Sequence, residues 1–361
     1  MQTSLFEDEV VEPKKSSVPM RYYFYSKQKN REIMPVQDEE LNAAAKAKLD
    51  VIFRDKQHLI PSRFKADWEH VALFSPNGNL EKANAILIDP HDGAYDLGNA
   101  LNDLTGKEWT KFTSSWFIFN ALPSDLKQEK ELDPHIEDHP ATFSPTMISD
   151  FIKFFTKEGM SVLDPFCGIG STMEACRRTN RVGYGTELNP KYFNLILKRV
   201  PEFKDNIFNA DAQSIPELGI KDIDFSISSP PYWDILNRST AGFEQRRTKR
   251  NLDVKYSDTE QDLGNISDYD MFMDKLAQIY LNIYNVLRDG AYLVVIIKNV
   301  KKGGVMYPIA WDLANRLSKT YVLKDEKLWI QDKVGLAPYG YPHSWAANII
   351  HHYCLIFRKE K

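Results

Sequence analysis

Asp164-Pro165-Phe166-Cys167-Gly168-Ile169-Gly170-Ser171 joins a short apolar segment, Ser161–Asp164, to a segment with helical character, Ser171–Thr179. A strand that leads into a glycine loop and then into a helix is the context in which such loops bind nucleotide-like ligands. Because glycine lacks a Cβ atom, the loop backbone at Gly168 and Gly170 can approach a ligand closely. A Gly-x-Gly pair also occurs in ordinary tight turns, so the rest of the chain must support this interpretation.

Strand-like and helix-like segments alternate along the chain on both sides of this loop. The expected helices are Phe143–Phe155, Ser171–Thr179, Pro190–Val200, Asp268–Leu287 and Tyr307–Lys319. The expected strands are Ser161–Asp164, Arg181–Glu187, Asn206–Asn209, Asp222–Ser228, Ala291–Lys298, Tyr321–Gln331 and Ile349–Arg358. This alternation predicts an α/β fold with a doubly wound, mostly parallel sheet.

The chain of 361 residues is long enough for one large domain and an appendage. Residues 1–19 are charged and interrupted by prolines, which predicts a mobile tail. Residues 20–132 are expected to form an accessory subdomain that is mostly helical, with helices at Glu39–Phe53 and Asp96–Thr105. The alternating pattern assigns residues 133–361 to the main domain.

Composition narrows the class of protein. Apolar residues make up 43% and charged residues 27%, as in ordinary soluble proteins, and no segment has signal-peptide or transmembrane character, so we expect a cytoplasmic protein without membrane contact. The three cysteines lack CxxC spacing, and the adjacent His351 and His352 would point to opposite faces of a strand, so no metal site is expected. The net charge of −4 means that any nucleic-acid surface must be a local basic patch.

A second motif, Ser228-Ser229-Pro230-Pro231-Tyr232-Trp233, ends an expected strand fewer than 60 residues after the glycine loop. Two prolines restrict the backbone, which would hold the Pro230 carbonyl in a fixed position. That carbonyl and the Ser229 side chain could accept hydrogen bonds from a planar amine. Tyr232 could stack on a nucleobase, with Trp233 either extending that platform or packing beneath it.

Together the two motifs resemble the signature motifs of the S-adenosylmethionine-dependent DNA amino-methyltransferases, which methylate exocyclic amines of cytosine or adenine. The resemblance runs from His139 to Lys361. It implies a seven-stranded methyltransferase sheet with a C-terminal antiparallel hairpin, S-adenosyl-L-methionine as cofactor, and double-stranded DNA as a substrate whose target base is flipped out of the helix. A cognate restriction endonuclease or another defence-system subunit is a candidate partner.

The resemblance also assigns cofactor-binding residues. Glu187 would accept hydrogen bonds from the ribose, and Asp211 would lie near the adenine; as alternatives, Glu187 is a helix N-terminal acid and Asp211 a turn residue. The segment around His139 and Phe143 would close over the methionine end, although Ser144 and Pro145 also read as a helix cap. The complete set is Asp164, Pro165, Phe166, Gly168, Gly170, Ser171, Glu187, Asp211, His139 and Phe143.

A basic segment directly follows the second motif and is expected to contact DNA phosphates. Together with Trp233, the DNA-binding candidates are Arg238, Arg246, Arg247, Lys249, Arg250 and Lys255. The alternative is a solvated surface loop. A smaller cluster, Lys298, Lys301 and Lys302, could add further phosphate contacts.

Four candidate functions follow. Methylation of N4 of cytosine leads, because in the resembling family Ser before Pro-Pro-Tyr correlates with cytosine. N6 of adenine is the alternative, since both bases present an amine beside a ring nitrogen. An RNA guanine-amine methyltransferase shares the motif order. A recognition subunit without activity is the non-enzymatic alternative, which the intact Ser229-Pro230-Pro231-Tyr232 motif disfavours.

Overall fold

The structure, a computed structural model, describes residues 23–24, 34–35, 39–56, 60–64, 71–74, 81, 84–89, 93–120, 143–233 and 262–360. The chain divides into a larger unit, mainly Ser114–Ile152 and Gly159–Lys361, and a smaller unit, mainly Leu5–Thr113 and Lys153–Glu158. In this division the larger unit resumes at Ser114, and the sequence pattern places the start of the main domain at residue 133. The expected tail, residues 1–19, lies outside the described residues.

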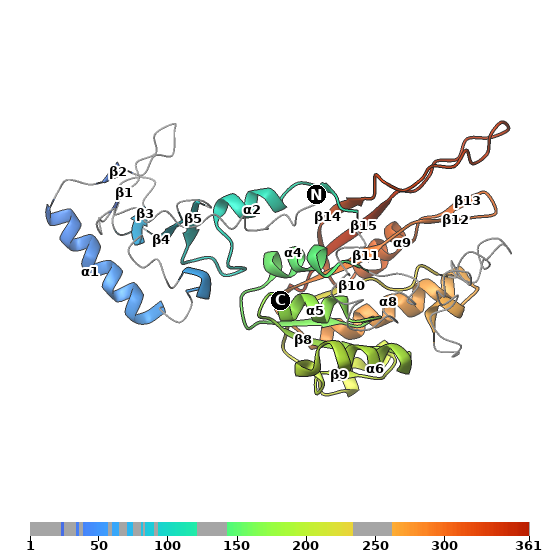
Figure 1. Cartoon of the computed structure of the whole chain (residues 1–361), viewed down its shortest axis with the longest axis horizontal. Helices are drawn as coiled ribbons and strands as arrows, with labels where there is room; N and C mark the ends of the chain where they lie inside the picture. Colours follow the sequence, from blue (N-terminus) through green and yellow to red (C-terminus); the bar gives the residue numbers. More distant parts are fainter. Residues whose placement is uncertain are drawn as a thin grey trace. The chain divides into compact units, whose positions relative to one another are not determined.

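A single large sheet organises the larger unit (Figure 1). Its strands, in spatial order, are β6 (Trp116–Ile118), β14 (Val322–Ile330), β15 (His351–Arg358), β11 (Leu287–Ile297), β10 (Ile223–Ser228), β7 (Ser161–Asp164), β8 (Val182–Thr186) and β9 (Ile207–Phe208). β15 is antiparallel to both of its neighbours, and the other pairings are parallel. The predicted doubly wound sheet with a C-terminal antiparallel hairpin is confirmed.

The sheet has eight strands instead of the expected seven, because β6 joins its edge. Trp116–Ile118 pairs in parallel with Leu328–Ile330, more than two hundred residues later in the chain. Three residues are too few to show a strand periodicity, and the pairing partner is remote in sequence. The number of strands was therefore not predictable from the pattern alone.

Helices connect these strands and supply much of the core. They are α4 (Pro145–Phe155), α5 (Ser171–Arg178), α6 (Pro190–Arg199), α8 (Tyr269–Val286) and α9 (Ile309–Leu317). α8 and α9 lie side by side, and their buried apolar residues pack in one cluster with those of β11. The segment Leu293–Ile297 of β11 is fully buried, which explains its uninterrupted apolar sequence. None of the described helices is long and apolar enough to cross a membrane.

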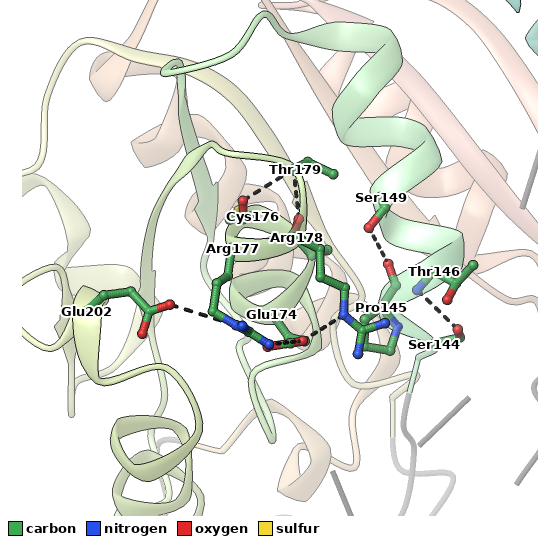
Figure 2. A network of polar contacts seen from close by, with 11 residues as sticks. Ser144, Pro145, Thr146, Ser149, Glu174, Cys176, Arg177, Arg178, Thr179 and Glu202 are labelled. Atoms are coloured by element: carbon green, nitrogen blue, oxygen red, sulfur yellow. Dashed lines mark hydrogen bonds and ion pairs between the residues drawn. The ribbon is translucent and has the colours of Figure 1, made fainter. Parts of the chain in front are cut away.

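Local interactions hold the helices that flank the glycine loop (Figure 2). The buried carboxylate of Glu174 in α5 accepts hydrogen bonds from Arg177 and Arg178, with N–O distances of 2.6 to 2.8 Å. At the start of α4, the Thr146 amide donates to Ser144 Oγ at 3.2 Å, and Pro145 is the first helical residue. The cap predicted at Ser144 is thus confirmed.

The described part of the smaller unit contains both helices and sheets, whereas the sequence predicted a mostly helical subdomain. β3 (Val71–Phe74), β4 (Asn84–Asp89) and β5 (Gly93–Asp96) form an antiparallel sheet, and β1 (Tyr23–Phe24) pairs with β2 (Met34–Pro35). The helices are α1 (Glu39–Lys56), close to the predicted position, and α2 (Gly106–Phe112).

The helix expected at Asp96–Thr105 does not form. Asp96 and Asn99 side chains instead accept hydrogen bonds from the amides of Gly98 and Leu101, at 2.7 and 3.0 Å. Such local bonds compete with the helical backbone pattern, which is why Asp and Asn favour turns and caps. α2 begins only after these turns, where Thr105 and Glu108 form a capping box.

Candidate active site

The two sequence motifs lie at the ends of neighbouring strands. The glycine loop follows β7 and the Ser229–Tyr232 turn follows β10, and these strands pair in parallel. Their carboxyl ends therefore meet at one edge of the sheet, at the point where the order of the strands reverses. Both motifs line one cleft of about 1100 Å³, including its open mouth. Predicted residues in its lining are Phe143, Asp164, Pro165, Phe166, Gly168, Ser171, Glu187, Asp211, Ser229, Pro230, Pro231 and Tyr232.

The two glycines of the loop have different positions. Both have positive φ, +54° at Gly168 and +84° at Gly170, which favours glycine. Gly168 lines the cleft, whereas Gly170 precedes α5, where a Cβ would lie 3.0 Å from Cγ2 of Ile196. Gly168 thus faces the cleft, and Gly170 takes part in the packing of α5 against α6.

Asp164 holds the loop from the inside. Its carboxylate accepts hydrogen bonds from Thr172 Oγ1 at 2.5 Å and from the Phe166 amide at 2.9 Å. Burial raises the pKa of Asp164 to about 6, although both hydrogen bonds act in the opposite direction. The carboxylate therefore connects the end of β7 to the first turn of α5, in addition to lining the cleft.

Glu187 connects the loop to the next strand end. Its two carboxylate oxygens accept hydrogen bonds from the Gly168 amide at 2.8 Å and the Asn189 amide at 2.7 Å. Burial raises the pKa of Glu187 to about 8. Each oxygen retains a further lone pair, so the carboxylate can still accept bonds from a ligand.

The raised pKa of Glu187 predicts a pH-dependent stability of the ligand-free protein. Between the ordinary glutamate pKa of 4.5 and about 8, the unfolded chain has released this proton while the folded carboxyl retains it. Stability should therefore fall as pH rises through this window, and become independent of this group above it. Glu187→Gln should flatten the decline of the thermal midpoint across this range. An equal decline in the variant would contradict the assignment.

Ser171 and Asp211 also line the cleft. Ser171 Oγ is buried and has no hydrogen-bond partner among the described residues, so a ligand could satisfy it. Asp211 Oδ1 accepts a bond from the Gln213 amide at 2.9 Å, as a turn and cap residue would. Because Asp211 also lines the cleft, the two interpretations of this residue are compatible.

The Ser-Pro-Pro-Tyr turn is held by hydroxyl pairs. Ser229 Oγ and Tyr232 Oη share a hydrogen bond at 2.9 Å, and Ser228 Oγ shares one with the buried Tyr280 Oη at the same distance. The Tyr232 ring lies 5.7 Å from the His352 ring, tilted by 52°. Tyr232 thus contributes both a hydroxyl to Ser229 and an aromatic face to the cleft.

Trp233 is buried, whereas its predicted contact with DNA would need an exposed ring. The residue is only 2% exposed, and its ring lies 5.1 Å from Tyr269 and 4.7 Å from Tyr307. A positive φ of 58° accompanies this inward position. Trp233 packs beneath the turn, which was the other role considered for it. His139 and the six basic DNA-binding candidates, Arg238, Arg246, Arg247, Lys249, Arg250 and Lys255, lie outside the described residues.

Several lining residues were missed from the sequence. Asn189 could have been found, because Asn-Pro before a helical pattern marks a cap, and Asn189 Oδ1 accepts a bond from the Lys191 amide at 2.9 Å. Asp262, which is buried and caps a short turn, carried no local signal and enters the cleft only through the fold. Among the described residues, no cluster of His, Cys, Asp or Glu is arranged to hold a metal ion.

The ring of His352, a residue not expected to bind a metal, lies within a row of aromatic rings beside the cleft. The ring stacks on Trp329 at 4.3 Å, and Trp329 lies 5.5 Å from Phe143. Burial lowers the pKa of His352 to about 3, so its imidazole is neutral at physiological pH. Its Nδ1 atom has no hydrogen-bond partner within the described part of the chain.

Curated relatives match short segments of the chain. The type II methyltransferase M.BglI of Bacillus subtilis is 35% identical over 104 residues, which are 28% of this chain and 26% of the relative. M.XycI of Xanthomonas campestris pv. cyanopsidis is 37% identical over 79 residues, 22% of this chain and 26% of the relative. A tRNA (guanine(10)-N2)-dimethyltransferase of Methanocaldococcus jannaschii is 29% identical over 133 residues, 33% of this chain and 38% of the relative. The match thus spans about a quarter of the length of the first two relatives.

Solved structures with some likeness include TrmN of Thermus thermophilus, with a TM-score of 0.38 and 12% identity over 94% of this chain and 73% of that one. A TehB-like methyltransferase of Corynebacterium glutamicum has a TM-score of 0.37 and 11% identity over 66% of this chain and 98% of that one. The family model that matches, described as DNA methylase, covers residues 17–198. The matched segment includes the glycine loop and Glu187. It begins at residue 17, well before His139, where the resemblance in sequence motifs begins. Since this match covers half of the sequence, the chain belongs to the DNA methylase family, whose methyl donor is S-adenosylmethionine.

Proposed function

We propose that this chain methylates an exocyclic base amine in DNA, with N4 of cytosine as the first candidate. The observation that carries the proposal is that the glycine loop, Glu187 and the Ser229–Tyr232 turn line the same cleft. A cofactor bound at the loop and a base held at the turn would therefore be neighbours. Such proximity is the main requirement for transfer between two bound groups.

The residues of the cleft fit S-adenosylmethionine. The Glu187 carboxylate has lone pairs for the ribose hydroxyls, and the unsatisfied Ser171 hydroxyl offers a further polar contact. In this proposal Asp211 lies near the adenine, and Phe166 and Phe143 supply apolar surface. His139 keeps its proposed place at the methionine end, although it lies outside the described residues.

When bound, S-adenosylmethionine supplies an electrophilic methyl group, and the protein must present the base amine to it. The Ser229 hydroxyl and the Pro230 carbonyl would accept hydrogen bonds from the two amine N–H groups. These bonds oppose delocalisation of the nitrogen lone pair into the ring and direct it outward. Tyr232 would hold the flipped base by stacking. No strong general base is needed, because the proton leaves after the nitrogen has attacked.

Cys167 is not suited to be a nucleophile, although it lies in the cleft. The residue is 5% exposed, and burial raises the pKa of its thiol well above the ordinary value. Enzymes that methylate carbon 5 of cytosine need a reactive cysteine thiolate. The product proposed is therefore an N-methylated base, not 5-methylcytosine.

Mass spectrometry of nucleosides tests the proposal directly. DNA and RNA from a host expressing the chain should be digested and compared with those from a host expressing Ser229→Ala. N4-methylcytosine in DNA supports the lead candidate, and N6-methyladenine supports its alternative. The tRNA methyltransferase match makes N2-methylguanosine in RNA a second candidate, which the same digest detects. If the wild-type host and the Ser229→Ala host had the same nucleoside profile, the proposal would be wrong.

The basic segment after the turn remains a proposed phosphate-binding segment. Replacing Arg246, Arg247 and Arg250 together with Gln should weaken duplex binding and flatten its dependence on salt. Each lost phosphate contact removes roughly one unit from the slope of log affinity against log salt concentration. Fluorescence anisotropy across a salt series measures this slope. An unaltered slope would mean that the segment is a solvated surface loop without phosphate contacts. The type II relatives make a cognate restriction endonuclease the candidate partner.

A further inference from the structure

The connection between β14 and β15, residues 331–350, carries aromatic side chains that have almost no cover. Tyr341 is 81% exposed and Trp345 is 89% exposed, and Tyr339 and Leu336 are also largely exposed. Figure 1 shows this connection, in red, extending away from the sheet. Large apolar side chains gathered in this way on a surface usually mark an interaction site.

The tip of this connection has its own internal structure. The Asn348 side chain bonds both backbone groups of Ala337, at 2.9 and 3.0 Å, which closes the loop at its neck. Within the loop, the amides of His343 and Ser344 donate to the Gly340 carbonyl at 2.8 and 2.7 Å. Gly340 has a φ of +81°, and a Cβ there would lie 2.3 Å from the Ser344 carbonyl oxygen. These bonds give the loop a defined backbone conformation, although its aromatic side chains are largely exposed.

The loop leaves the sheet at the edge that holds the cleft. β14 is antiparallel to β15, β15 is antiparallel to β11, and β11 is parallel to β10. The carboxyl ends of β14 and β10 therefore lie at the same edge, and the loop and the Ser229–Tyr232 turn both begin there. The hairpin formed by β12 (Val300–Lys302) and β13 (Val305–Tyr307) follows β11 at this edge as well.

Lysines accompany the aromatic residues. Lys301 Nζ donates to the Ala347 carbonyl at 2.7 Å and lies 6.0 Å from the centroid of the Trp345 ring, so the hairpin contacts the loop. Residues 298–311 contain three lysines and no acidic residue. In the loop, Lys333 is exposed, while the neighbouring Asp332 accepts a bond from the Asn120 side chain. Positive charge beside exposed aromatic faces suits a nucleic acid, which offers phosphates and stackable bases together.

We propose that the 331–350 loop engages DNA, with Trp345 and Tyr341 stacking on bases that become exposed where the duplex is opened. The inference rests on the proposed function, since it assumes a DNA substrate at the cleft. A base can be removed from the helix only at the cost of its stacking, and aromatic side chains that replace this stacking lower that cost. Phosphate contacts at the neighbouring lysines would position the strand without reading its sequence.

Two probes test this inference without knowledge of the target sequence. One is a short fluorescein-labelled duplex, and the other is the same duplex with its central bases left unpaired. The wild-type protein should bind the opened probe more tightly. In the double variant Trp345→Ala with Tyr341→Ala, affinity for the opened probe should fall by at least about thirtyfold, since stacking is lost at two bases. The salt slope should stay the same, because no phosphate contact is removed.

Two matched variants separate stacking from a general loss of apolar surface. Trp345→Phe with Tyr341→Phe keeps the aromatic faces and should retain most of the preference for the opened probe. Leu323→Ala removes an exposed apolar side chain at the opposite end of β14 and should leave both affinities unchanged.

The outcomes distinguish this inference from the proposed function. If the wild-type protein methylates DNA but the double alanine variant keeps the wild-type preference, the loop assignment is overturned. If the wild-type protein neither binds nor methylates DNA, the proposed function itself fails. Analytical ultracentrifugation completes the test, because a dimer that the double variant converts to a monomer would make the loop a self-association surface instead.

Discussion

Ser229→Ala is expected to lower kcat by about two to three orders of magnitude while leaving the affinity for S-adenosylmethionine nearly unchanged, which is the scale seen when one preorganised hydrogen-bonding group is removed from a catalytic site. The Ser229 hydroxyl is proposed to accept a bond from the base amine, and its loss leaves that N–H without its acceptor. The side chain is half-buried and lies outside the core, so the fold should persist. Steady-state methylation measures kcat, and calorimetry measures cofactor affinity.

Tyr232→Phe is the matched control for this prediction. It removes the 2.9 Å hydrogen bond between the Tyr232 and Ser229 hydroxyls but keeps the aromatic ring and the Ser229 hydroxyl. If Ser229 acts on the amine, the rate of Tyr232→Phe should be much less affected than that of Ser229→Ala. Equal losses in both variants would mean that the bond between the two side chains, and not acceptance from the amine, is what matters.

Gly185→Ala is expected to destabilise the larger unit and to abolish cofactor binding. A Cβ at this position in β8 would lie 2.2 Å from the Cys167 sulfur and 2.6 Å from the Asp164 carbonyl oxygen. The Asp164 carbonyl oxygen cannot move away easily, because Asp164 pairs with Gly185 in the register of β7 and β8. The added methyl group must therefore push apart two core strands or displace the glycine loop. Overpacking of this kind costs about 1–3 kcal/mol, and more where backbone must move.

Thermal unfolding and calorimetry with S-adenosylmethionine measure the two effects. Gly335→Ala is the control, because a Cβ there would meet no atom within 4 Å. Adding Cys167→Ala to Gly185→Ala removes the sulfur contact but leaves the contact with the Asp164 oxygen, so rescue should be partial. Full rescue would show that only the flexible side chain opposed the methyl group.

The sequence by itself determined the core of the larger unit. The strand expected at Ser161–Asp164 is present as β7 with the same bounds, and α6 begins at Pro190, as expected. Buried parallel strands are continuous apolar runs, and helix caps depend on a few adjacent residues. Both can therefore be recognised from a short stretch of sequence. The proximity of the glycine loop to the Ser229–Tyr232 turn was predictable, because both follow strands of one parallel sheet.

The tertiary structure alone decided the features that depend on distant partners. β6 is a strand because Trp116–Ile118 finds an edge at β14, and Asp262 lines the cleft because the chain returns there after β10. Trp233 is next to Tyr232 in sequence, yet it is buried between Tyr269 and Tyr307 while Tyr232 faces the cleft. Edge pairing and burial are set by which surfaces meet in the folded chain, and residues far apart in sequence contribute those surfaces. For this reason no local pattern around Trp233 could distinguish a base-contacting ring from a buried one.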